Sequence, residues 1–229
     1  MTPASGSTRL PIFPLPSVVL FPTLSVPLYI FEPRYRAMTR AALEGNRRIG
    51  MVTIRPEAVD SMAGDPEVFS VGCEGEIGRA RPRPDGTLDI LLVATRRFEI
   101  VEEPARSDPY RSALVEPLEE EAWDRDSPEI ATARRSIGAS LGTLSGQGPP
   151  GVPERPDERH ADRLEALAAL ADERFVHVVA QAVDLGVGEK QRLLEAPGVA
   201  PRYRLLDAFL RFRVAELGAN PAPGPETLQ

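Results

Sequence analysis

The first half of the chain is built from short hydrophobic runs that proline and glycine punctuate. Such runs, rich in valine, isoleucine, leucine and phenylalanine, are typical of β-strands. The predicted strands are 10–13, 18–21, 24–31, 49–54, 68–77, 88–95, 98–102 and 110–117. Many prolines fall within or beside these runs, where they cannot donate a ladder hydrogen bond. The pattern therefore predicts edge strands and bulges, and a small irregular barrel fits it better than a flat sandwich.

A helix is predicted to interrupt this half over residues 33–45. Pro33 suits the first helical position, where its missing N–H costs nothing. Gly45 or Asn46 ends the helix. The face predicted to plug one end of the barrel consists of Tyr35, Met38, Ala42 and Leu43.

The second half of the chain changes to a helical period. Ser127-Pro128-Glu129 has the N-cap, the first-position proline and the acidic first turn of a helix start. The predicted helices, which form a small bundle, are 128–144, 160–184, 188–195 and 199–217. Both chain ends are polar or rich in proline and glycine, as in disordered tails. The predicted parts are therefore a tail at 1–8, a β-rich part at 9–118, a helical part at 119–217 and a tail at 218–229.

Composition excludes several kinds of chemistry. Among the 27 basic residues of this 229-residue chain, only Lys190 is a lysine, and it lies outside any P-loop pattern. One cysteine, Cys73, and two histidines exclude an internal disulfide and argue against a metal site, so no cofactor is predicted. The net charge of −7 argues against nucleic acid as a partner. Without a long apolar run or a signal-peptide pattern, the expected location is the cytoplasm, with no membrane partner.

Three alternating arginines form a charged strip. Arg79, Arg81 and Arg83 would point to one side of an extended segment. The strip could bind phosphate or an acidic peptide. A solvated hairpin arm is the favoured explanation, because surface charge runs are common and weakly specific.

Glu32 stands between apolar residues and the predicted helix start. Its carboxylate can accept the orphan N–H groups of the first turn or pair with an arginine. The candidate partners are Arg34, Arg36, Arg96 and Arg97. A structural role is favoured, because no second titrating group can be placed beside Glu32, and no catalytic residue is predicted. Gly148–Pro153 resembles the opening of a P-loop but lacks the Gly-Lys that must follow, which indicates a flexible loop.

Seven segments together resemble one protein family. They are Leu10–Leu15, Val19–Pro22, Pro27–Met38, Val71–Cys73, Arg97–Ile100, Pro109–Tyr110 and Glu189–Glu195. The third reads P-L-Y-I-F-E-P-R-Y-R-A-M and the last E-K-Q-R-L-L-E, similar to the LON substrate-binding domain, the N-terminal domain of ATP-dependent Lon protease. The resemblance covers roughly residues 9–217. Thr23 and Ala94 depart from it, because each stands where the family usually has glycine.

The resemblance implies an α+β fold, with an N-terminal PUA-like β-barrel and one plugging helix followed by a C-terminal helical bundle. It also implies a non-enzymatic module that binds peptides or proteins, similar to the stand-alone bacterial LON-domain proteins. Without a P-loop or a protease dyad, the chain is expected to lack the ATPase and protease activities of Lon. The expected partners are unfolded or partner polypeptides, together with a chaperone or an ATP-dependent protease.

Two functions stay open at this point. A peptide could add to an open barrel edge and contact apolar side chains. The candidate contacts, most of which could equally belong to the core, are Leu28, Tyr29, Phe31, Tyr35, Met38 and Phe98. Alternatively, RNA could bind, as it does to PUA-like barrels elsewhere, through Arg79, Arg81 and Arg83 together with Arg96 and Arg97. A hidden hydrolase is disfavoured, because no catalytic constellation is present.

Overall fold

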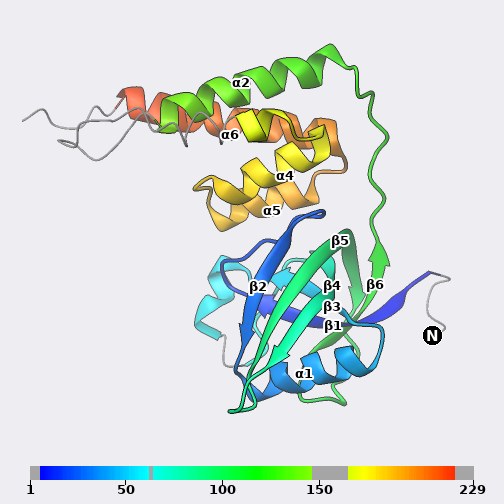
Figure 1. The fold of residues 1–229 in the computed structure, drawn as a ribbon. Coiled ribbons are helices and arrows are strands. Elements are labelled where there is room, and N and C mark those ends of the chain that lie inside the picture. The colour runs from blue at the N-terminus through cyan, green and yellow to red at the C-terminus, as the bar shows by residue number, and fades with distance from the viewer. Residues whose placement is uncertain (1–5, 62–63, 146–164, 220–229) are drawn as a thin grey trace, which may run out of the picture. The chain divides into compact units, whose positions relative to one another are not determined.

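The computed structural model describes residues 6–61, 64–145 and 165–219 (Figure 1). Contacts divide the chain into two compact units, one of Met1–Glu121 with His177–Pro197 and one of Ala122–Val176 with Gly198–Gln229. The predicted division between 118 and 119 stays a prediction. The predicted loop at Gly148–Pro153 and most of the two predicted tails lie outside the described residues.

Six strands form one mixed sheet in the first unit. They are β1 (Thr8–Leu15), β2 (Ser25–Ile30), β3 (Arg48–Thr53), β4 (Val71–Pro82), β5 (Leu88–Glu102) and β6 (Ser112–Pro117). Their order is β2-β5-β4-β3-β1-β6, with a parallel pairing between β1 and β3. β6 also pairs with the end of β5, so the pairings return to β5 and leave β2 at the edge, where Figure 1 shows it beside β5.

β5 is the strand to which most of the sheet connects. Its first half pairs with β2, and its last residues pair with β6. On the other side β4 follows it with two register shifts. We predicted two strands here, 88–95 and 98–102. The structure joins them into one strand, because Arg96 and Arg97 continue the ladder with β4.

The hydrophobic run 18–21 is not a strand, contrary to the prediction. Pro16 and Pro22 flank it, and neither can donate to a ladder. Its last three side chains are buried and fill the core from an irregular segment. Burial without strand pairing therefore produced the apolar pattern.

Thr23 follows this segment with a left-handed backbone, at a φ of 67°. This region favours glycine, and a β-branched residue is strained there. The Thr23 N–H donates to the Ala94 carbonyl at 3.2 Å, and the Ala94 N–H donates to the Leu24 carbonyl at 2.8 Å. The two positions that depart from the glycines of the LON pattern are thus hydrogen-bonded neighbours.

One cluster in the core of the sheet closes around the Phe98 ring. Its buried members are Leu10, Ile12, Val52, Phe98, Ala113 and Val115. A Cβ at Gly72 would stand 2.5 Å from Phe98 Cζ and 2.6 Å from the Met51 carbonyl oxygen. A Cβ at Gly50 would stand 2.8 Å from the same ring carbon. The ring can pack this closely only because both positions lack a side chain.

α1 (Pro33–Glu44) confirms the predicted helix and packs against β1 and β3. Its buried side chains are Tyr35, Met38, Thr39 and Ala42. The Tyr35 ring lies 4.3 Å from the ring of Phe13, centroid to centroid. Gly45 forms the C-cap, as one of the two predicted alternatives. A short 3-10 helix, η1 (Pro56–Ser61), follows β3.

α5 (Val187–Glu195) is attached to β4 by residues of the E-K-Q-R-L-L-E segment. Gln191 is buried, and its Nε2 donates to the Val71 carbonyl at 2.9 Å. Lys190 Nζ donates to the Gln181 carbonyl at 3.0 Å. The single lysine of the chain therefore makes a structural contact.

The second unit contains several helices. They are α2 (Pro128–Ser145), the first turn of α4 (Asp172–Ala182) and α6 (Val199–Ala219), with α2 packed along α6. Each agrees with part of the helical pattern in the sequence.

Arg134 of α2 explains why the predicted helix 160–184 is broken. Its guanidinium donates at 2.6 to 3.4 Å to the carbonyls of Leu167, Ala168 and Leu170. It also donates to Asp172 Oδ1 at 2.6 Å and lies 4.1 Å from the Phe175 ring centroid. The guanidinium therefore takes up the carbonyls that would otherwise accept hydrogen bonds within a continuous helix. A new helix begins at Asp172.

Candidate polypeptide-binding surface

Three strands, β2, β5 and β4, present one side of the sheet to solvent. The register places three rows across them, Ser25–Val93–Glu76, Pro27–Leu91–Arg79 and Tyr29–Asp89–Arg81. Residues directly opposite one another in antiparallel strands share a face, so these rows lie on one outer face. The intervening β5 side chains, Ile90 and Leu92, are buried on the inner face.

Apolar side chains gather on this outer face. We define the outer-face patch as Pro27, Tyr29, Phe31, Leu91 and Val93. Tyr29 is 49% exposed, Phe31 58% and Val93 38%. The rings of Tyr29 and Phe31 stack with their centroids 5.8 Å apart. A contiguous exposed set of large apolar side chains indicates an interaction surface, whereas single exposed ones do not.

Arg83 and Asp89 hold the Tyr29 ring in place. Arg83 donates from Nε and Nη2 to the two Asp89 carboxylate oxygens at 2.8 and 2.9 Å. Its guanidinium carbon lies 4.9 Å from the centroid of the Tyr29 ring. The hydrogen bond to Asp89 raises the pKa of Arg83. A ring that is already positioned loses less conformational entropy when a ligand binds.

β2 also leaves one backbone edge without a partner strand in the described part of the chain. Leu24 accepts a hydrogen bond from Ala94, so by alternation Ser25, Pro27 and Tyr29 direct their backbone groups away from β5. Pro27 has no N–H, which leaves Ser25 and Tyr29 as the donors of this edge. The open edge can therefore pair with an extended segment, with fewer hydrogen bonds than an edge without proline would form.

The six apolar residues predicted to contact a peptide do not share one environment. Tyr29 and Phe31 are exposed, whereas Leu28 is half-buried on the inner side of β2. The other three are corrected to core residues, namely Tyr35, Met38 and Phe98. All three are buried in the first unit.

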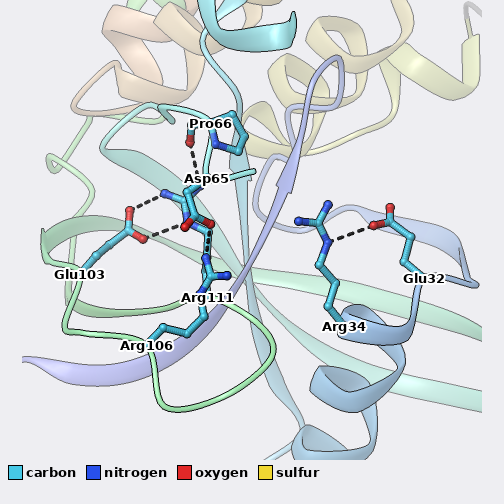
Figure 2. Close-up of polar contacts among 7 residues, drawn as sticks. All are labelled: Glu32, Arg34, Asp65, Pro66, Glu103, Arg106 and Arg111. Carbon is cyan, nitrogen blue, oxygen red and sulfur yellow. Dashed lines mark hydrogen bonds and ion pairs between the residues drawn. The ribbon is translucent and has the colours of Figure 1, made fainter. Parts of the chain in front are cut away.

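Glu32, at the N-cap of α1, adopts one of its two predicted arrangements. Its side chain makes no capping hydrogen bond, and Arg34 Nε donates to Glu32 Oε2 at 2.9 Å (Figure 2). Arg34 also lies 4.6 Å from the Tyr35 ring centroid, where burial raises the pKa of Tyr35 and the Arg34 charge partly opposes that shift. Arg36, another predicted partner, lies against Gly86 instead.

Arg96 and Arg97 leave β5 on opposite sides, and neither pairs with Glu32. Arg96 is partly exposed and pairs with the buried Glu74 at 3.2 Å. Arg97 is 2% exposed, and its Nε donates to Glu120 Oε1 at 2.7 Å. Its other nitrogens donate at 3.1 to 3.3 Å to the carbonyls of Glu119, Leu194 and Pro197. We predicted that this pair would extend the arginine strip at residues 79–83 as an RNA-binding surface. That prediction is wrong, because Arg97 is buried and Arg96 is paired with Glu74.

Arg111 organises a charged loop cluster that sequence reasoning missed (Figure 2). It donates to the Pro66 carbonyl at 2.7 Å and to the two Glu103 carboxylate oxygens at 2.9 and 2.6 Å. Beside it Arg106 pairs with Asp65. The four charged side chains line a cavity of about 160 Å³. The partners come from loops far apart in the sequence, so no spacing pattern announces the cluster.

Comparison with known proteins assigns the chain to a family. Residues 9–211 match the model of the ATP-dependent protease La (LON) substrate-binding domain. The chain therefore belongs to the LON substrate-binding domain family. In the described residues, none of the helices has the length and apolar character needed to cross a membrane. The same residues contain no group of three or more His, Cys, Asp or Glu side chains that could hold a metal ion.

The relatives include whole proteases and isolated domains. Lon protease 2 of Herpetosiphon aurantiacus is 30% identical over 210 residues, which are 90% of this chain and 24% of that protein. The chain spans about a quarter of the length of the curated relatives it matches. The solved Lon N-terminal domain protein from Xanthomonas campestris has a TM-score of 0.61 and 24% identity, covering 88% of this chain and 98% of that one. The N-terminal domain of Mycobacterium avium complex Lon protease has a TM-score of 0.66 and 17% identity, covering 89% and 98%.

Proposed function

We propose that this chain is a polypeptide-recognition module whose outer-face patch holds an extended apolar segment of an unfolded or partner protein. The observation that carries the proposal is the exposed, stacked pair of Tyr29 and Phe31 beside the open edge of β2. Membership of a substrate-binding family supports recognition as the class of function. The pairings from β5 through β4, β3, β1 and β6 back to β5 support the interpretation of the sheet as a PUA-like barrel.

Two kinds of contact would act together on such a segment. The rings of Tyr29 and Phe31 offer a large apolar area. Because Arg83 already holds the Tyr29 ring, less conformational entropy is lost when a ligand binds there. The β2 edge adds main-chain hydrogen bonds, which do not depend on the sequence of the ligand. A surface of this kind binds many sequences with modest affinity, which suits the recognition of unfolded chains.

The proposed activity is binding without catalysis. The matched family is a substrate-binding domain, which supports a division of labour with a chaperone or an ATP-dependent protease that receives the polypeptide in the cytoplasm. RNA binding is the weaker alternative, because the engagement of Arg96 and Arg97 leaves a shorter basic strip.

Fluorescence anisotropy with labelled, reduced and carboxymethylated α-lactalbumin, a permanently unfolded probe, tests the proposal. The double variant Tyr29→Ser/Phe31→Ser is expected to bind about tenfold more weakly or worse, because the two rings together contribute at least about 1.4 kcal/mol of apolar burial. Phe212→Ser is the matched control, since Phe212 is 60% exposed but belongs to the second unit. Equal affinities for wild type and the double variant, or an equal loss in the control, contradict the proposal.

A further inference from the structure

The outer-face patch has a basic flank. Arg79 and Arg81 of β4 occupy the same rows as Pro27 and Tyr29, and both arginine side chains are exposed. Among the described residues, neither arginine makes an ion pair. Asp89, the carboxylate opposite Arg81, is already bound by Arg83 through two hydrogen bonds. Two guanidinium groups therefore face solvent on the same face as the exposed Tyr29 ring, two strands away from it, with no carboxylate of their own.

The charges of this face follow a fixed order. Glu76 is exposed and lies in the row of Val93, at the opposite end of the face from Arg81. β4 therefore carries Glu76, which stands opposite Arg48 of β3, in the row of Val93, and its two arginines in the rows of Leu91 and Tyr29. Arg79 and Arg81 are alternate residues of one strand, so their Cα atoms lie about 7 Å apart. Because the chain as a whole carries a net charge of −7, this flank is a local departure from the overall sign.

We infer that the outer-face patch selects extended segments that carry apolar and acidic residues on the same side, at every second position, an inference that rests on the polypeptide recognition proposed above. An apolar side chain packs on Tyr29 and Phe31, while carboxylates meet Arg79 and Arg81. Alternate side chains of an extended segment have the same spacing as the two arginines. A guanidinium binds a carboxylate through paired hydrogen bonds. Glu76 repels an acidic residue at the other end and so favours one direction of the bound segment.

An RNA strand fits this face less well than an acidic peptide. A phosphate backbone needs a continuous row of cations, and here the basic flank is followed by Glu76 in the next row. Tyr29 and Phe31 offer rings on which bases can stack, whereas Pro27, Leu91 and Val93 offer none. A peptide can use more of this face than RNA can, because it combines apolar packing with contacts to the flanking charges.

Three fluorescein-labelled ten-residue peptides separate charge selection from apolar recognition. All carry leucine and phenylalanine at the same positions, with glutamate, glutamine or lysine at two further positions on the same side of the extended peptide, each two residues from the next. The glutamate peptide is expected to bind about three- to tenfold more tightly than the glutamine peptide in 50 mM salt, the size expected of two exposed ion pairs. The lysine peptide is expected to bind most weakly. The differences should shrink in 500 mM salt, because screening weakens exposed pairs.

Matched charge variants locate the effect. Arg79→Gln/Arg81→Gln is expected to bind the glutamate and glutamine peptides equally, with its affinity for the glutamine peptide unchanged. Arg125→Gln/Arg135→Gln removes the same two charges from exposed positions of the second unit and should keep the preference. If both variants lose the preference for the glutamate peptide, the preference depends on net charge alone and the inference is overturned.

The remaining outcomes also decide between explanations. Wild-type protein that binds the glutamate and glutamine peptides equally, through Tyr29 and Phe31, overturns the inference and leaves the proposed function standing. Wild-type protein that binds none of the peptides contradicts the proposed function itself. A single-stranded RNA that displaces the glutamate peptide and binds more tightly assigns the face to nucleic acid. A stable dimer in sedimentation that Tyr29→Ser/Phe31→Ser dissociates assigns it to a second copy of the chain.

Discussion

Replacing Arg97 with lysine should destabilise this protein much more than the same change at Arg96. The two residues are neighbours in β5, and both changes keep the positive charge. The buried Arg97 guanidinium spreads its donors over the Glu120 carboxylate and three backbone carbonyls. A lysine has three donors on a single nitrogen and cannot reproduce the planar fork. It therefore cannot reach all of these partners at once.

The geometry sets the expected size of the effect. The four hydrogen bonds of Arg97 measure 2.7 to 3.3 Å. If lysine keeps the Glu120 contact and leaves two buried carbonyls without a donor, the free energy of unfolding falls by about 2 to 4 kcal/mol. Arg97→Met also leaves Glu120 without its cation, which costs about 3 to 5 kcal/mol. The Arg96 side chain is 46% exposed, so Arg96→Lys should change stability by less than about 1 kcal/mol.

Urea unfolding followed by circular dichroism makes the comparison. Arg97→Lys should shift the midpoint to lower urea with an unchanged slope, while Arg96→Lys should stay near wild type. Similar midpoints for Arg97→Lys and wild type would refute the reasoning, because the fork of hydrogen bonds would then contribute nothing that an ammonium cannot replace.

Three further changes test local features of the fold. Thr23→Gly should raise the free energy of unfolding by about 0.5 to 1 kcal/mol, because glycine accepts the left-handed backbone, and the melting temperature should rise. Thr23→Ala keeps the strain and should bring no such gain. Gly72→Ala should lower the urea midpoint by overpacking that costs about 1 to 3 kcal/mol, whereas Gly138→Ala, where a Cβ meets nothing within 4 Å, should leave the midpoint unchanged or raise it. Burial raises the pKa of Tyr203 above its ordinary value of 10.0, so the unfolded state ionises first and stability falls as the pH rises past that value. Tyr203→Phe should therefore show a smaller fall in urea midpoint between about pH 9 and pH 11, and an identical fall would contradict the assignment.

Hydrophobic periodicity located most of the elements because it records which side of each element faces the core. The helix at 33–45 and the last helix at 199–217 were predictable for this reason. The prediction of a strand at 18–21 was wrong, because a buried irregular segment has the same composition as a buried strand. The break within 160–184 depends on the guanidinium of Arg134, which reaches it from another helix, so no local signal marks it.

The candidate site was harder to predict, since neighbouring residues of similar type have opposite environments. Leu28 and Tyr29 are adjacent in β2, but the pleat of the strand turns one inward and the other to solvent. Arg96 and Arg97 differ in the same way, and only the pairing of β5 with β4 and β6 decides which one is buried. The cluster around Arg111 joins separate loops, and its partners follow from the tertiary fold alone.

Amide chemical-shift mapping by NMR tests the central claim most directly. The isotopically labelled protein is titrated with the unlabelled unfolded probe, and the shifts are assigned residue by residue. The account predicts that the largest changes fall in residues 25–31 of β2 and its following segment and in 89–93 of β5. Changes confined to the Arg111 loop cluster or to α6, with β2 and β5 unaffected, would contradict it.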